Sequence, residues 1–130
     1  MKMLFVANEG LAASLKKSLN EYFTVDEITA IDFCHPDHKQ AANVLANELQ
    51  QALSRNPAET FLILADTFGS TAYIETCLLL EKSGLKDRSL ILTGMNLPLA
   101  IKCYGLKDSL PFATLTSLLS DSAKSLETAC

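Results

Sequence analysis

The sequence predicts an α/β protein, built as an open three-layer α/β/α sandwich around a mainly parallel sheet. Strand-like and helix-like patterns alternate along the chain with short connections, which is typical of parallel sheets. The apolar run at 61–65 is too short for a helix and suits a strand buried on both faces. Right-handed crossovers between four such strands favour the order 2-1-3-4. With 130 residues, the chain is expected to form a single domain over 1–130.

The first half of the chain predicts two strands and two helices. Residues 3–7 are apolar and predict a strand, and apolar residues at helical spacing predict a helix over 11–22. The stretch 25–33 predicts a second strand, which alternates early and is therefore placed near the sheet edge. Pro36 suits the first turn of the next helix, with Asp37 in a favoured acidic position, and that helix is expected to end near Arg55.

The second half predicts two more strands, at 61–65 and 88–93. A helix is expected over 70–82, followed by Gly84 as a left-handed cap. A short helix is expected over 98–105, and a leucine-rich helix after Pro111. This completes the alternation expected of a doubly wound sheet.

Composition argues against several classes of partner and location. The chain is 48% hydrophobic and 20% charged, with a net charge of −4 and no run of Lys or Arg, so neither nucleic acid nor an anionic membrane is an expected partner. Its apolar runs are far shorter than the roughly 20 residues that span a bilayer. The N-terminal MKMLFVANEG leads into polar residues and is interpreted as a strand rather than a signal peptide. Four cysteines without a CxxC pair indicate a reduced, cytoplasmic location.

Two carboxylates follow strands that are expected to be neighbours. Glu9 follows the first strand and Asp66 ends the third. In the order 2-1-3-4 the strand order reverses between these strands, and ligands of open parallel sheets bind at that point. We therefore expect Glu9 and Asp66 to face each other across a crevice. A structural alternative stays open, because Asp66 with Thr67 and Ser70 can cap the third helix.

Four segments in register resemble a known family. They are ANEG at 7–10, AIDF at 30–33, DTFGST at 66–71 and GMNLPLA at 94–100. The chain resembles the enzyme IIA domain of the mannose family of the bacterial phosphoenolpyruvate-dependent sugar phosphotransferase system. That family shows GTHG-like, WIDF-like, DTWGGSP-like and GVNIPML-like segments in the same order. The match extends over nearly the whole chain.

The resemblance implies a phosphoryl relay. The family's histidine in GTHG accepts a phosphoryl group from the small carrier HPr and passes it to a IIB protein. By resemblance, Asp66 takes the position that orients this histidine, while Thr67, Ser70 and Thr71 lie where the phosphoryl group is cradled, and Asn96 lies on a rim for partner docking. The resemblance also implies a homodimer, with a C-terminal segment that is a candidate for exchange between protomers. The resemblance implies no cofactor. It also implies a cytoplasmic protein, with the periphery of a membrane permease complex as a candidate location.

The acceptor position of the resemblance holds Glu9 instead of histidine. Glutamate side chains ordinarily titrate near pH 4.3 and are anions at neutral pH, so Glu9 would repel the phosphate on HPr, and Asp66 would add to the repulsion. An acyl phosphate on Glu9 would normally need a metal ion to neutralise charge. One carboxylate pair offers few ligands for a metal, so we expect neither a bound metal nor an acyl phosphate. Glu9 is therefore interpreted as a divergent acceptor, either placed favourably at a helix start or mimicking phosphohistidine.

Other functions remain open from the sequence. The first is a non-catalytic regulatory or binding module on the same fold. The phosphotransfer subunit of dihydroxyacetone kinase, whose enzyme IIA-like domain shares this fold, is a variant of the enzyme IIA hypothesis itself. Another is a response-regulator receiver with Asp66 as acceptor, although a second acid, a lysine and a fifth strand are missing from the pattern. His35 and His38 are interpreted as loop residues, with a displaced acceptor or a zinc site with Cys34 as alternatives.

Overall fold

The computed structural model describes residues 1–34 and 36–129, and the side chains of 1–34 and 36–120. The strands are β1 (Lys2–Asn8), β2 (Thr29–Phe33), β3 (Phe61–Ala65) and β4 (Ser89–Leu92). The helices are α1 (Leu11–Leu19), α2 (His38–Arg55), α3 (Thr71–Lys82), α4 (Leu97–Leu106) and α5 (Phe112–Ala129), with a 3-10 helix η1 (Lys86–Arg88) before β4.

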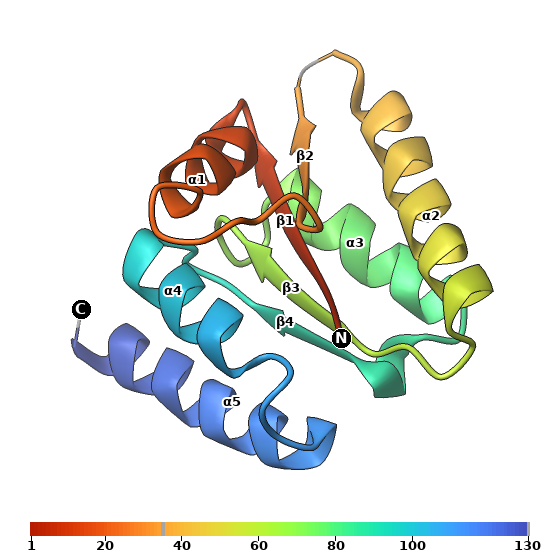
Figure 1. Cartoon of the computed structure of the whole chain (residues 1–130). Coiled ribbons are helices and arrows are strands. Elements are labelled where there is room, and N and C mark those ends of the chain that lie inside the picture. The colour runs from red at the N-terminus through yellow and green to blue at the C-terminus, as the bar shows by residue number, and fades with distance from the viewer. Residues whose placement is uncertain (35, 130) are drawn as a thin grey trace.

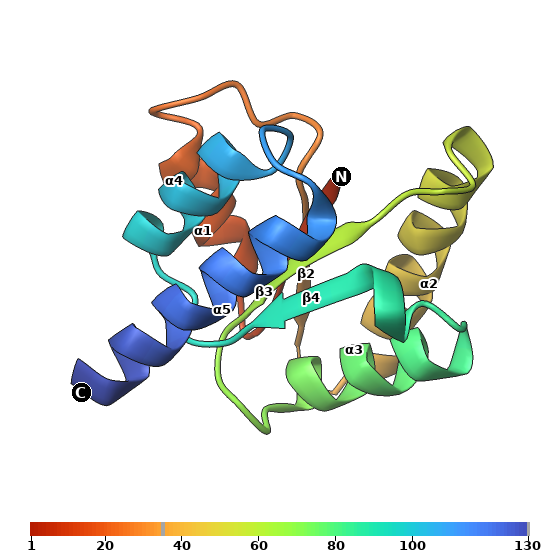
Figure 2. The ribbon, with the colours of Figure 1, turned by 90° about the horizontal axis from the view of Figure 1, so that it is seen from below.

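The strands form one parallel sheet in the order β2-β1-β3-β4, which confirms the predicted class and strand order. Helices cover both faces, as Figures 1 and 2 show, with α1, α4 and α5 on one face and α2 and α3 on the other. The fold is therefore the three-layer sandwich that the alternation of patterns predicted.

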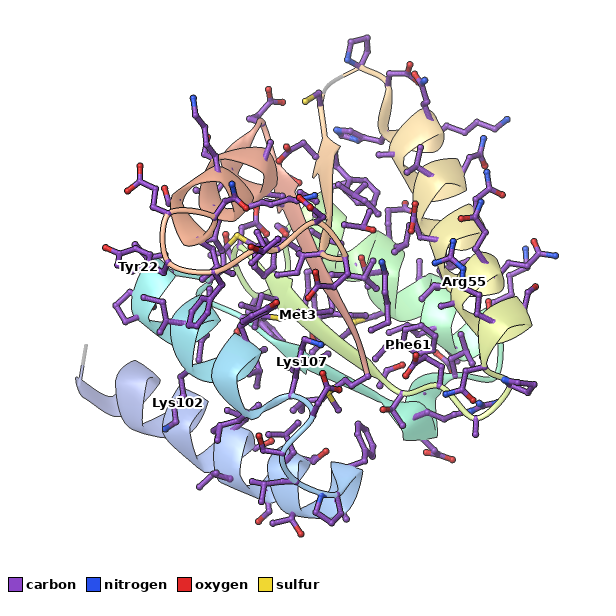
Figure 3. The ribbon with its side chains drawn as sticks, in the orientation of Figure 1. Met3, Tyr22, Arg55, Phe61, Lys102 and Lys107 are labelled. Carbon is purple, nitrogen blue, oxygen red and sulfur yellow. The ribbon has the colours of Figure 1, made fainter. Side chains whose placement is uncertain are left out.

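Two hydrophobic cores lie on the two faces of this sheet. Because successive strand residues point to opposite faces, Met3 packs toward α1 and α4, whereas Phe61 packs toward α2 (Figure 3). The central strands β1 and β3 pair in register, with Leu4 opposite Ile63. All five residues of β3 are buried, as expected of an inner parallel strand. This packing fixes the positions of the loops that follow β1 and β3.

The second strand is shorter than predicted. We expected it to start at Val25, but residues 25–28 form a turn in which the N–H of Ile28 donates to the carbonyl of Val25 (3.0 Å). Both side chains are buried in the same core as α1. Apolar residues three apart that pack on one side need a turn, because a strand would direct them to opposite faces. The prediction of a strand over residues 25–28 was therefore wrong.

Helix ends also differ from the predictions. The first helix ends at Leu19 instead of Tyr22. The second begins at His38, so Pro36 lies outside the helix, and Asp37 is its N-cap without a capping side-chain bond. His38 is thus the first helical residue rather than part of a loop, and His35 lies outside the described residues. These shifts of one to three residues are usual at helix ends.

The last helix packs on its own chain. Leu115 and Leu119 of α5 are buried in the core that α1 and α4 share. Exchange of a C-terminal segment between protomers stays a prediction, since side chains beyond residue 120 are not described. Among the described helices, none combines the length and apolar character needed to cross a bilayer.

Candidate functional site

The carboxyl ends of the parallel strands bring the predicted site residues to one edge of the sheet (Figure 1). Asp66, directly after β3, lies at the centre. Its Oδ2 accepts the N–H of Asn8 (2.9 Å), and its Oδ1 accepts the N–H of Thr67 (2.8 Å) and the hydroxyl of Ser70 (2.6 Å). The carboxylate therefore ties the end of β1 to the loop between β3 and α3.

The start of α3 is capped by two side chains. Ser70 is the N-cap, and its hydroxyl oxygen accepts the N–H of Tyr73 (3.1 Å). Asn8, at the end of β1, accepts the N–H of Ala72 (3.1 Å) through its Oδ1. The predicted capping role is thus real for Ser70, while Asp66 acts on the loop before the helix. Asn8 was missed, because its partner lies 64 residues away in the sequence.

The start of α1 is capped from a neighbouring strand. Asp32 of β2 accepts the N–H groups of Ala12 (2.9 Å) and Ala13 (3.1 Å) with its two carboxylate oxygens. These are orphan donors of the first helical turn, where a negative charge is also favoured by the helix dipole. From the sequence, Asp32 stood out only as part of AIDF. Its position at the end of a strand next to β1 was the signal that could have revealed this role.

Glu9 lies in the turn between β1 and α1. Its φ is 58°, in the left-handed region that non-glycine residues rarely adopt, and Gly10 follows with φ 91°. The side chain of Glu9 is exposed. Two consecutive left-handed residues reverse the chain within this short connection. Asp66 hydrogen-bonds residue 8, so the turn that carries Glu9 adjoins the Asp66 loop.

The fourth connection is fixed to the same edge. Asn96 is the N-cap of α4: its Oδ1 accepts the N–H of Leu99 (2.8 Å) and its Nδ2 donates to the carbonyl of Gly94 (3.2 Å). The N–H of Gly94 donates to the carbonyl of Asp66 (2.9 Å). Asn96 thus lies beside the Asp66 loop, and its amide shapes the turn and the helix start.

The segments that carry these polar groups also carry exposed apolar residues. Phe68, in the loop after Asp66, is 77% exposed, and its ring lies 5.0 Å from that of Tyr73 between centroids. Leu11, at the start of α1, is 46% exposed. Pro98 is exposed at the start of α4. Apolar groups rimming a polar centre are a common composition of protein docking surfaces.

The histidine and zinc alternatives stay predictions, because His35 lies outside the described residues. Within the described part of the chain, no three His, Cys, Asp or Glu side chains are grouped so that they could hold a metal ion. Cys34 is exposed, and its carbonyl accepts the N–H of Asp37 (2.8 Å). A response-regulator receiver would have a fifth parallel strand. The sheet formed by the described residues has four strands and no fifth one.

A family model matches residues 4–117, and its description is "PTS system fructose IIA component". The chain belongs to this enzyme IIA family. The matched range includes β2, β3, β4 and all but the first two residues of β1, together with every predicted site residue. Among curated proteins, no match was found.

Solved structures agree with this enzyme IIA fold. The phosphotransferase system component EIIA of Streptococcus agalactiae is 18% identical, with TM-score 0.74, and the alignment covers 99% of this chain and 98% of that one. A mannose/sorbose specific IIA subunit from Enterococcus faecalis is 17% identical, with TM-score 0.72, covering 96% and 90%. A sigma-54 interaction domain protein from Enterococcus faecalis is 14% identical, with TM-score 0.76, covering 97% and 92%. At these identities the likeness extends to the fold alone.

Proposed function

We propose that this enzyme IIA-family chain is a docking component of a sugar phosphotransferase system and does not itself carry the phosphoryl group. The observation that carries the proposal is the exposed carboxylate of Glu9 in the β1–α1 turn, next to the Asp66 loop. A phosphoryl acceptor here has to present a nucleophile without repelling the donor phosphate. An anionic carboxylate beside Asp66 repels it, and a protonated one is no longer a nucleophile.

Asp66 supports the proposal through what it binds. In an active relay its carboxylate would hold the acceptor imidazole. Here its oxygens accept two backbone N–H groups and the Ser70 hydroxyl, which keeps the loop in shape for docking. Thr67, Ser70, Thr71 and Asn96 then serve as the frame of a partner surface. In this proposal their contribution to a phosphoryl cradle is lost together with the acceptor.

The partners of this proposal are an HPr-like carrier and a IIB-like protein. We further propose that the chain acts as a homodimer, in the cytoplasm or at the periphery of a permease complex. Size-exclusion chromatography with light scattering tests the dimer directly. A mass of one chain at all concentrations would contradict it.

Intact-mass spectrometry tests the central claim. The chain is incubated with phosphoenolpyruvate, enzyme I and HPr, and wild type is compared with Glu9→His and the isosteric control Glu9→Gln. We expect no phosphoryl adduct on wild type or Glu9→Gln and a single adduct on Glu9→His. That result would mean that the docking face is intact and that residue 9 alone determines acceptance.

The opposite result is equally informative. A phosphoryl adduct on wild type would refute the proposal, and mapping would decide between Glu9 and the histidines. If Glu9→His also stays unmodified, HPr binding by wild type becomes the deciding measurement. Absence of binding as well would remove the docking role.

A further inference from the structure

The face around Glu9 and Asp66 is negatively charged by composition. Three of the four connections at the carboxyl end of the sheet are residues 8–12, 66–72 and 93–98, and they contain two carboxylates and no Lys, Arg or His. The remaining connection follows the edge strand β2 and contains His35 and Asp37, and α2 then begins with His38 and Lys39. The three connections that follow β1, β3 and β4 therefore carry a net negative charge, which comes from Glu9 and Asp66.

Several N–H groups at the helix N-termini of this edge already have acceptors. Free N–H groups at a helix start normally make a site for anions. In this chain, oxygens of Asp32, Asn8, Ser70 and Asn96 already accept first-turn N–H groups of α1, α3 and α4. One of the caps is itself a carboxylate. An incoming phosphoryl group would compete with these acceptors for the same N–H groups while approaching the carboxylates of Glu9 and Asp66.

Contact area is still available around the charged centre. Phe68 projects from the loop with 77% of its surface exposed, and Leu11 and Pro98 add apolar surface on the two adjoining helices. Aromatic side chains that become buried on binding are frequent sources of affinity. The face thus offers apolar attraction to a protein together with repulsion of an anion.

From this combination we infer that the face selects the phosphorylation state of its partner, binding an unphosphorylated HPr-like carrier and rejecting the phosphorylated one through Glu9. The inference rests on the proposed docking function and adds to it a preference for the unphosphorylated carrier. A carrier presents the same apolar contacts in both states, but its phosphoryl group adds negative charge where this face is negative. Like charges brought together at an interface oppose binding. Docking would then depend on the fraction of carrier that has lost its phosphoryl group.

Isothermal titration calorimetry with two probes tests the inference. The probes are HPr, and phospho-HPr kept charged with enzyme I and phosphoenolpyruvate. For wild type we expect HPr to bind at least about tenfold more tightly, which corresponds to about 1.4 kcal/mol. The variant Glu9→Gln keeps the shape and removes the charge, so the ratio of the two dissociation constants should fall severalfold. Raising the salt concentration should also lower the ratio in wild type.

The matched control is Glu21→Gln, an exposed glutamate that follows α1 at its other end. It should leave the ratio at the wild-type value. Equal affinities for the two probes, or a ratio that Glu9→Gln does not change, would overturn the inference while the docking function stands. Absence of binding to either probe would overturn both.

Discussion

The two ends of the sheet use polar side chains in different ways. At the amino end, one side chain connects two elements: the hydroxyl of Tyr104 in α4 shares its single proton between Oε1 of Glu27 (2.7 Å) and the carbonyl oxygen of Thr24 (2.8 Å), and Lys107 lies over the Tyr104 ring. At the carboxyl end, Asp66 and Asp32 mainly accept backbone N–H groups of loops and helix starts. The amino-end bonds hold α4 against the loop before β2, whereas the carboxyl-end bonds determine the shape of exposed loops.

This difference separates stability from recognition. The amino-end contacts join segments that are 77 to 80 residues apart, so their loss loosens α4 from the loop before β2. The carboxyl-end contacts include capping bonds that fix loop shape, and they leave Glu9 and Phe68 exposed. We therefore expect substitutions at exposed carboxyl-end residues to change binding with little effect on folding. Asp66 should be the exception, because it does both.

The largest expected effect on stability is that of Asp66→Ala. It removes the acceptor of three hydrogen bonds, two of them from backbone N–H groups, so the free energy of unfolding should fall by about 2–4 kcal/mol. Urea unfolding followed by circular dichroism measures the change. Asp66→Asn retains one acceptor oxygen and should lose less. The exposed carboxylate control Asp87→Ala should stay within about 0.5 kcal/mol of wild type, and a loss as small for Asp66→Ala would mean that the loop tolerates the missing carboxylate.

An intermediate effect is expected at the amino end from Tyr104→Phe. Losing the hydroxyl should cost about 1 kcal/mol at neutral pH, with the exposed Tyr22→Phe as the near-neutral control. The hydrogen bond from Tyr104 holds the pKa of Glu27 below its ordinary value, and the same bond raises the pKa of Tyr104 to about 12. In Tyr104→Phe the pKa of Glu27 should rise, which an NMR titration of its carboxyl carbon measures.

The pH dependence follows from the directions of these shifts. A raised tyrosine pKa contributes stability below its unfolded pKa of about 10, which is lost as pH rises toward 12. A lowered glutamate pKa contributes stability above its unfolded value of 4.5, which is lost as pH falls through the folded pKa. The difference between wild type and Tyr104→Phe should therefore be largest between about pH 5 and pH 10. A difference independent of pH would show that the hydrogen bond does not connect these two titrations.

The smallest expected effect on stability is that of Phe68→Ala, at about 0.5 kcal/mol or less, because the side chain is 77% exposed. Its effect on binding should be large, with HPr affinity reduced by about tenfold or more in calorimetry. Tyr22→Ala removes another exposed aromatic, 60% exposed, that follows α1 and should leave binding unchanged. Equal losses of affinity in both variants would place the docking face elsewhere.

Much of the fold could be predicted from local pattern. The alternation of strands and helices, the buried run at β3 and the order β2-β1-β3-β4 all follow from periodicity and connection handedness. The turn at 25–28 was missed because Val25 and Ile28 resemble strand residues until their burial on one side is known. The positions of Glu9, Asp66 and Asn96 at one edge were predicted, since all three follow parallel strands that end there, whereas their functional roles stay a prediction.

Which residues reach this edge was already set by the order of the amino acids, because parallel strands carry their following loops to the same side. What each residue does there depends on the folded arrangement. Asp32 caps a helix 20 residues before it, and Asn8 reaches a helix 64 residues after it, because β1 lies between β2 and β3 in the sheet. A hydrogen bond requires atoms within about 3 Å, and strand register sets that distance rather than sequence spacing. The place of Glu9 after the first strand was visible in the sequence, whereas the hydrogen bonds that cap the helices around it emerged from the folded chain.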